Sequence, residues 1–290
     1  MGVGYAELIG DPVAQSKSPL IHKFWLAKLG MAGDYRVARI ASDRLHRYLR
    51  DRRGDPDWLG CNVTMPHKRA AVAFMDRLGR SAERCRAVNT IVAEGDRRLV
   101  GRNTDALAVA DLLRSRQPAR YPGHVATYVQ VVGAGGAAWA AVIGAADAGY
   151  IDFEFYNRTV AKAQALAVRL GLDPQAYAAP IEALGPIRNP DDGPDDQRYS
   201  HVVINATSRG MTGFPELEAD LSRYYPDTVI LDMPYKPGGT AFAKAARALG
   251  LPVIDGFDML TSQAAPAFEA FFGVPAPRRH DLELRELLTS

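Results

Sequence analysis

The sequence predicts an α/β protein with two domains, because short apolar runs alternate with helical patterns and a glycine-rich turn joins one such pair near mid-chain. With 290 residues, the chain is long enough for two domains that each bury a core. Its residues are 47% hydrophobic and 23% charged, as in an ordinary globular protein. A formal net charge of +2 gives no reason to expect a nucleic-acid partner.

The first half of the chain predicts a small α/β domain. Strands are expected over 5–9, 35–40 and 58–63, a hairpin over 89–93 and 98–100, and helices over 18–29, 45–52, 68–78 and 105–116. Ser18 precedes Pro19 and is the expected N-cap of its helix, which Gly30 ends.

The glycine-rich turn predicts a Rossmann-type domain that binds a dinucleotide. Gly133-x-Gly135-x-x-Ala138 follows the apolar run 128–132 and opens the helical stretch 137–148. Gly133 permits the tight turn, Gly135 lets a pyrophosphate approach, and Ala138 lets helix and strand pack closely. A second strand-like run, 151–156, follows at the expected distance. The alternative is a structural turn without a ligand.

The end of that second run indicates which dinucleotide binds. Asn157-Arg158-Thr159 follows it, with Lys162 one helical turn beyond Arg158. Two cations and no carboxylate suit the 2′-phosphate of NADP, whereas an NAD site usually places Asp or Glu here. Glu154 lies inside the strand rather than at its end. A solvated helix start is the alternative, but cations there oppose the helix dipole.

The rest of the chain continues the alternation. Strands are expected over 202–205 and 229–232, a crossover helix over 240–249, and helices that return to the first domain over 255–290. The stretch 187–200, with four Asp among Pro and Gly, is expected to be a surface excursion, and 117–123 a connection. The expected domain boundaries are therefore 1–117, 118–254 and 255–290.

Cysteine, histidine and hydropathy patterns narrow the class of protein. Cys61 and Cys85 lack metal-site spacing and are expected to be buried in a protein of a reducing compartment. The six histidines are scattered, so no metal site is expected. No apolar stretch reaches membrane-spanning length and no signal pattern opens the chain, which predicts a cytoplasmic protein without a membrane partner.

Polar side chains collect where elements of the first half begin or end. They occur in SKSP at 16–19, GCNVTMPHK at 60–68, AVNT at 87–90 and GRNTD at 101–105. Strand ends are where α/β proteins build sites, and these groups suit a ligand with a carboxylate and several hydroxyls. Alternatives from the residues alone are a solvated Lys68 at a helix start and a first-turn Asp105 favoured by the dipole.

Together with later motifs, this set resembles the shikimate dehydrogenase family. The later motifs are GAGGA at 133–137, NRT at 157–159, NATSRGM at 205–211, DMPYKPGGT at 232–240 and GFDMLTSQAA at 256–265. The ordered set spans Ser16 to Ala265, and its order makes it specific. The resemblance implies NADPH-dependent reduction of 3-dehydroshikimate to shikimate, a step of chorismate and aromatic amino-acid biosynthesis, in a cleft between the two domains. A homodimer is one possible assembly of the protein.

The resemblance also implies roles for single residues. Ser16 and Ser18 would bind the substrate carboxylate. Lys68 would be the catalytic amine, paired with Asp105. Four residues would contact substrate hydroxyls: Thr64, Asn89, Tyr235 and Gln263. For Asn62 and Asn103, a structural role is the alternative to a substrate contact. The cofactor would be bound by Gly133, Ala134, Gly135, Gly136, Ala137, Asn157, Arg158, Thr159, Lys162, Asn205, Thr207, Ser208, Met211, Gly256 and Met259.

Four residues depart from the family pattern. Lys23 stands where the family usually has Asn. Trp139 follows the glycine turn, where a smaller or basic residue is common, and Thr261 replaces the usual apolar residue before Gln263. Pro266 falls within the late helix and is expected to kink it or shift its start.

Three other functions stay open. A quinate/shikimate dehydrogenase often has an acid after the second strand and Thr at the second serine position, so Arg158 and Ser18 argue against it. A dehydrogenase of altered shikimates is the second. A non-catalytic NADP-binding regulator would keep the glycine turn but would not need both Lys68 and Asp105.

Overall fold

The computed structural model describes residues 3–116, 126–172, 177–185 and 199–289. They form two compact units: Met1–Leu107 with Thr261–Ser290, called unit 1, and Ala108–Leu260, called unit 2. The boundaries fall inside two helices, α4 (Thr104–Ser115) and α8 (Gly256–Phe272). The boundaries expected from the sequence stay a prediction.

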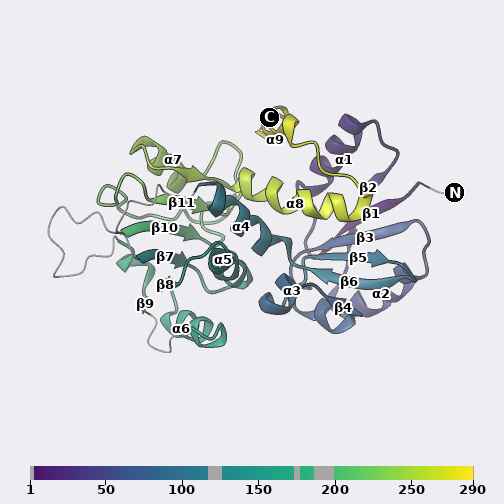
Figure 1. Cartoon of the computed structure of the whole chain (residues 1–290), viewed down its shortest axis with the longest axis horizontal. Coiled ribbons are helices and arrows are strands. Elements are labelled where there is room, and N and C mark those ends of the chain that lie inside the picture. The colour runs from purple at the N-terminus through teal and green to yellow at the C-terminus, as the bar shows by residue number, and fades with distance from the viewer. Residues whose placement is uncertain (1–2, 117–125, 173–176, 186–198, 290) are drawn as a thin grey trace. The chain divides into compact units, whose positions relative to one another are not determined.

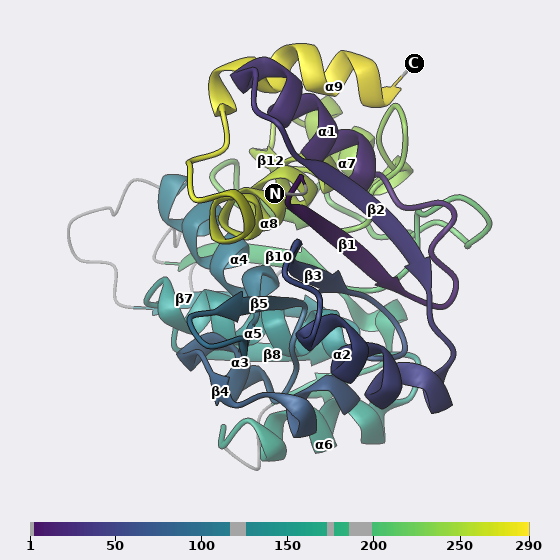
Figure 2. The ribbon, with the colours of Figure 1, turned by 90° about the vertical axis from the view of Figure 1, so that its right-hand side faces the viewer.

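Unit 1 is built on a six-stranded mixed sheet of order β2-β1-β3-β5-β6-β4 (Figures 1 and 2). β1 (Tyr5–Gly10) pairs in parallel with β2 (Asp34–Arg39) and β3 (Trp58–Val63), and the hairpin of β5 (Thr90–Glu94) and β6 (Arg98–Arg102) is antiparallel. The helices are α1 (Ser18–Leu29), α2 (Leu45–Arg53), α3 (Arg80–Cys85), the start of α4, most of α8, and α9 (Asp281–Thr289).

Both faces of β1 are buried because helices cover each of them. Ile9 packs with Leu45 and Leu49 of α2 on one face. Leu8 packs with Phe271 of α8 on the other, so the C-terminal chain does return to the N-terminal sheet. The close approach of α8 depends on Gly60 (φ +154°), where a Cβ atom would lie 2.7 Å from the Phe271 ring.

The last helix is also held in unit 1. α9 lies beside α1 (Figure 2), and Lys28 pairs with Glu283 at 2.7 Å. Pro266 lies well inside α8 and does not mark its start, so that part of the expectation is wrong.

Unit 2 is an all-parallel sheet of order β12-β11-β10-β7-β8-β9 with a crossover helix after most strands. The order reverses between β7 and β10, which is the switch point where such sheets bind ligands. Its elements are β7 (Ala126–Val132), α5 (Gly136–Asp147), β8 (Asp152–Tyr156), α6 (Val160–Arg169), β9 (Ala178–Ala179), β10 (Tyr199–Asn205), β11 (Val229–Asp232), α7 (Ala241–Ala248) and β12 (Val253–Ile254). The predicted α/β class with a Rossmann-type domain is confirmed.

The helix predicted over 68–78 is wrong. That segment forms a 3₁₀ helix, Ala70–Phe74, and a two-residue strand, β4 (Arg77–Leu78), which pairs with β6. Apolar residues three apart also share a face in a 3₁₀ helix, so the spacing of Ala71 and Phe74 fits either structure. Lys68 therefore lies in a turn and not at a helix start.

Several expectations concern residues outside the described ranges. The connection at 117–123 and the acidic stretch up to 198 are among them, while Tyr199 and Ser200 already belong to β10. Cys61 and Cys85 are buried, as predicted. Within the described ranges, no helix is long and apolar enough to span a membrane, and no cluster of His, Cys, Asp and Glu could hold a metal.

Candidate functional site

The structure joins the two predicted catalytic residues directly. Lys68 lies in the turn after β3, and its Nζ donates to Asp105 Oδ2 at 2.6 Å. The Lys68 side chain is 34% exposed and that of Asp105 is 17% exposed, so the pair is shielded yet open to a small ligand. The Lys68 carbonyl accepts from Val88 N at 2.7 Å, which anchors the turn. An ammonium group held by a carboxylate at a strand end can polarise an oxygen and deliver a proton.

The side chain of Asn89 forms hydrogen bonds within the protein. It is buried, and its amide oxygen accepts from Thr104 N at 2.8 Å while its Nδ2 donates to Thr104 Oγ1 at 2.9 Å. Asn103 caps the same helix, because its Oδ1 accepts from Ala106 N. These bonds fix the first turn of α4 and thereby the position of Asp105. A contact of Asn89 with substrate stays a prediction.

A second buried link runs from β2 to β5. The Tyr35 hydroxyl donates to Asn62 Oδ1 at 2.7 Å, and Asn62 Nδ2 donates to Thr90 Oγ1 at 3.0 Å. Thr90 Oγ1 donates in turn to Asn89 Oδ1 at 3.0 Å. Sequence reasoning missed Tyr35, because an aromatic residue in a strand carries no polar signal.

The predicted capping role of Ser18 is wrong. Lys17 occupies the N-cap position without a side-chain cap bond, and Ser18 is the first helical residue. Ser16 satisfies one backbone N–H group at the start of this helix, since its Oγ accepts from Ser18 N at 3.3 Å. The two hydroxyls lie 3.2 Å apart, so the structure does bring the predicted carboxylate ligands together.

The other predicted substrate residues are divided between the units. Thr64 and Gln263 are half-buried in unit 1, whereas Tyr235 is half-buried in unit 2.

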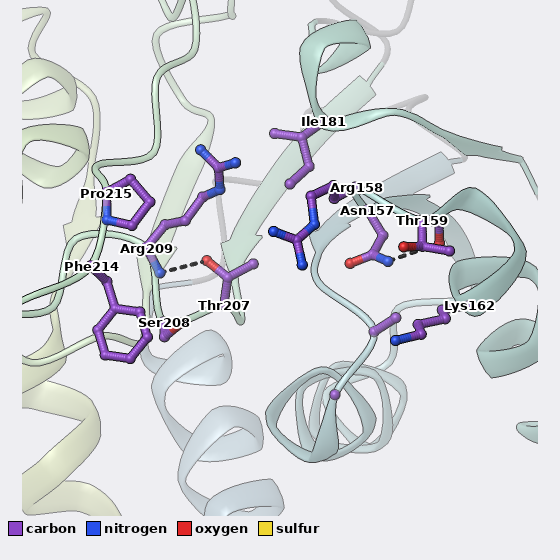
Figure 3. Close-up of a pocket in the computed structure, with 12 residues that line it drawn as sticks. Asn157, Arg158, Thr159, Lys162, Ile181, Thr207, Ser208, Arg209, Phe214 and Pro215 are labelled. Carbon is purple, nitrogen blue, oxygen red and sulfur yellow. Dashed lines mark hydrogen bonds between the residues drawn. The ribbon is translucent and has the colours of Figure 1, made fainter.

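Unit 2 contains a cavity of about 440 Å³ at the ends of β7, β8 and β10 (Figure 3). Eight of the predicted cofactor residues line it: Ala134, Gly135, Asn157, Arg158, Thr159, Lys162, Thr207 and Ser208. The others do not: Gly133, Gly136, Ala137, Asn205, Met211, Gly256 and Met259. Sequence reasoning missed four lining residues, Ile181, Arg209, Phe214 and Pro215. Of these, Arg209 carried a signal, because it follows β10 within the NATSRGM motif.

The glycine turn has the shape that a phosphate needs. Gly133 has φ +117°, and a Cβ atom there would lie 3.0 Å from the Ala206 carbonyl oxygen. At Gly135, the N-cap of α5, a Cβ atom would meet nothing within 4 Å, so the space before the helix is open. Ala138 is fully buried against the sheet. Backbone N–H groups at such a helix start attract an anion.

The lining carries cations and no carboxylate. Arg158, Lys162 and Arg209 all contribute to it. Glu154 does not line the cavity; its carboxylate accepts from Gln130 Nε2 at 3.1 Å and from the Tyr156 hydroxyl at 2.8 Å. An anion is therefore the ligand that this lining fits.

A buried carboxylate supports the loop after β10. Asp232 accepts from Asn205 Nδ2 at 2.8 Å and from the Thr240 hydroxyl, and burial raises the pKa of Asp232 to about 6. Asn205 Oδ1 accepts from Thr207 N at 3.1 Å, and Thr207 Oγ1 accepts from Arg209 N at 3.0 Å. This chain fixes the backbone that carries Thr207, Ser208 and Arg209 to the cavity.

The remaining departures from the family pattern lie outside the cavity lining. Trp139 is 4% exposed, and the guanidinium of Arg169 lies 5.4 Å from its ring centre. Lys23 pairs with Asp34 at 3.2 Å on the surface. Thr261 is buried and accepts from Arg278 at 3.3 Å.

Comparison with known proteins agrees with this geometry. Residues 8–91 match the model of the shikimate dehydrogenase substrate binding domain. Shikimate dehydrogenase (NADP(+)) of Sphingopyxis alaskensis is 44% identical over 286 residues, which cover 99% of this chain and 97% of the relative. The chain belongs to the shikimate dehydrogenase family. The resemblance predicted from the motifs is thus confirmed.

Solved structures of the shikimate dehydrogenase family share the fold. Shikimate 5-dehydrogenase of Thermus thermophilus, in complex with NADP(H) and shikimate, matches with a TM-score of 0.77 at 30% identity, over 98% of this chain and 99% of that chain. Ligand-free 5-ketofructose reductase of Gluconobacter matches with a TM-score of 0.83 at 24% identity, over 99% of each chain. The second likeness concerns the fold alone.

Proposed function

We propose that this member of the shikimate dehydrogenase family reduces 3-dehydroshikimate to shikimate reversibly with NADPH, in the biosynthesis of chorismate and aromatic amino acids. The observation that carries the proposal is the 2.6 Å contact between Lys68 Nζ and Asp105 Oδ2. A purely binding protein would have no need of an ammonium group held in this way. Relatives that are named NADP(+) shikimate dehydrogenases support the same reaction.

The residues present fit NADP. The cavity in unit 2 combines three cations, no carboxylate and an open glycine turn. The α5 N-terminus would hold the pyrophosphate, and Arg158 with Lys162 would hold the 2′-phosphate. When bound in its reduced form, the nicotinamide supplies a hydride to the carbonyl carbon.

The side chains of unit 1, together with Tyr235 of unit 2, would perform the rest of the reaction. Ser16 and Ser18 would orient the substrate through its carboxylate. Lys68 would stabilise the negative charge that develops on the carbonyl oxygen and would transfer a proton from Nζ to it. Asp105 would keep the ammonium group in place and accept a hydrogen bond from a substrate hydroxyl, while Thr64, Asn89, Tyr235 and Gln263 would complete the hydroxyl contacts.

Steady-state kinetics with two substrates and two cofactors test this proposal. We expect the highest kcat/KM for shikimate with NADP, lower values for quinate, and lower values for NAD with either substrate. Equal efficiency with quinate and NAD would favour the quinate/shikimate dehydrogenase instead. No turnover with any combination, together with tight NADP binding, would favour the regulator.

A cytoplasmic location and a homodimeric assembly complete the proposal and rest on the sequence alone. Size-exclusion chromatography with light scattering tests the assembly.

A further inference from the structure

Arg209 enters the cavity of unit 2 from a different element than the predicted phosphate ligands. Arg158 and Lys162 come from the end of β8 and the start of α6, whereas Arg209 comes from the loop after β10. Figure 3 shows Arg209 and Arg158 extending into the cavity from these two loops. The two guanidinium groups thus flank one space.

The surroundings of Arg209 do not neutralise its charge. Arg209 is half-buried, and its Nη1 donates to the Glu216 carbonyl oxygen at 3.3 Å. The Glu216 carboxylate pairs instead with Lys236 Nζ at 2.5 Å. Among the residues that the structure describes, Arg209 forms no salt bridge. A half-buried guanidinium that lines one cavity with two further cations favours an anionic ligand there, because removing a charge from water is costly.

The position of Arg209 is fixed at its backbone. Its N–H donates to Thr207 Oγ1 at 3.0 Å, and its carbonyl accepts from Asn205 Nδ2 at 3.2 Å. Asn205 is itself held by Asp232 at the end of the next strand. The loop therefore presents the Arg209 side chain without needing a ligand to order its base.

We propose that Arg209 binds the 2′-phosphate of NADP together with Arg158 and so determines the preference for NADP over NAD. The inference rests on the proposed NADP-dependent function. The pyrophosphate already has the N–H groups at the start of α5, whereas a 2′-phosphate, with a charge of about −1.5 to −2, suits two guanidinium forks.

Isothermal titration calorimetry with two small probes tests the proposal without turnover. Adenosine 2′,5′-bisphosphate carries the 2′-phosphate and 5′-AMP lacks it, and neither contains a pyrophosphate. We expect Arg209→Ala to weaken binding of the bisphosphate about tenfold and to leave 5′-AMP within about twofold. Arg209→Lys should lie between, because it keeps the charge but not the fork. Arg223→Ala removes an exposed arginine of unit 2 outside the cavity lining and should change neither affinity.

The outcomes separate the role of Arg209 from the proposed function. Equal weakening of both probes would mean that Arg209 contacts a group that they share, the adenosine or the 5′-phosphate. No change in either probe would mean that Arg209 does not touch the 2′-phosphate. Each result overturns the proposal. Equal loss for NADP and NAD with unchanged probes would assign Arg209 to the pyrophosphate and would also overturn it. A wild-type protein that binds both probes equally would overturn the NADP assignment as a whole.

Discussion

The candidate sites of the two units handle charge in opposite ways. In unit 1, Lys68 and Asp105 neutralise one another, and the amide of Asn89 is satisfied by Thr104. In unit 2, Arg158 and Arg209 line one cavity without a carboxylate in its lining. The site of unit 1 is therefore organised before a ligand arrives, whereas the electrostatics of unit 2 are completed by the ligand.

This difference predicts where variants act. Changes in unit 1 break a preformed geometry and should lower turnover, because preorganised groups act on the transition state. Changes in unit 2 remove attraction for an anion and should alter affinity and cofactor choice.

The strongest prediction concerns the ion pair of unit 1. Lys68→Ala should lower kcat for shikimate oxidation by about 10²- to 10⁴-fold with little change in KM, because its interaction strengthens in the transition state. Asp105→Asn keeps the shape but loses the charge, so it should lower kcat and also raise the KM for shikimate. Steady-state kinetics with NADP and shikimate measure both variants.

The double variant shows whether the pair acts as a unit. Residues in direct contact are not additive, so Lys68→Ala with Asp105→Asn should be far less impaired than the product of the single losses. Losses that simply multiply would show independent action, and an active Lys68→Ala would remove this residue from the mechanism.

His22 makes unit 1 sensitive to acid. It is fully buried and stacks on Tyr35 at 4.1 Å, and burial lowers the pKa of His22 to about 3. The unfolded chain binds a proton below about pH 6.5 and the folded chain does not, so the stability from this group is present above pH 6.5 and is lost as pH falls. Between pH 7 and 4.5 the free energy of unfolding should fall by about 2 to 3 kcal/mol through this group.

Urea unfolding of His22→Phe across this pH range checks the effect. Phe suits the aromatic surroundings and cannot titrate, so the pH slope should flatten relative to wild type, whatever the absolute stability. An unchanged slope would show that His22 keeps an ordinary pKa in the folded protein.

Asp232 should act in the opposite direction in unit 2. Burial raises the pKa of Asp232 to about 6, so between pH 4 and 6 the folded state binds a proton that the unfolded state releases. This contribution is present at low pH and is lost as pH rises through 6, about 2 to 3 kcal/mol at most. Asp232→Asn can still bond Asn205 and Thr240 and should remove the dependence. Urea unfolding of this variant between pH 4 and 7, compared with wild type, measures the change; an identical pH slope would refute it.

A substitution of Arg158 tests the preference of the unit 2 cavity for NADP over NAD. Arg158→Asp replaces a cation of the cavity by an anion, so it should abolish or reverse the preference for NADP. One charge-assisted bond contributes about 1.5 to 3 kcal/mol, so the wild-type preference should be at least about tenfold. The ratio of kcat/KM values for NADP and NAD measures it. A wild type that uses both cofactors equally well would contradict the assignment.

Much of this architecture could be predicted because periodicity and turn residues are local signals. The glycine turn, the β5–β6 hairpin and α1 with its Gly30 end all lie where the sequence indicates. The helix over 68–78 could not be ruled out locally, because its true form depends on pairing of β4 with β6, which is distant in sequence. Propensity alone does not contain such tertiary pairing.

The sites divide in the same way. The sequence indicates Lys68 because it follows a strand end, and Asp105 because it lies at a helix start. Their contact agrees with the pairing that the family resemblance implies. Sequence reasoning missed Arg209, although it lies within the NATSRGM motif, because a cation in a loop is usually solvated. Only the cavity shows that it shares a space with Arg158.

The smallest effects should come from the two serines at the start of α1, and here the structure changes the expectation. Ser16 Oγ accepts from Ser18 N at 3.3 Å, a long bond, and Ser18 does not cap the helix. Ser16→Ala should therefore cost about 0.5 kcal/mol of stability, the low end of the capping range, and Ser18→Ala should lose no cap. If both hydroxyls bind the substrate carboxylate, each variant should raise the KM for shikimate about two- to tenfold, with kcat nearly unchanged. Thermal unfolding and steady-state kinetics on the same preparations separate the two effects, and an unchanged KM in both variants would place the carboxylate elsewhere.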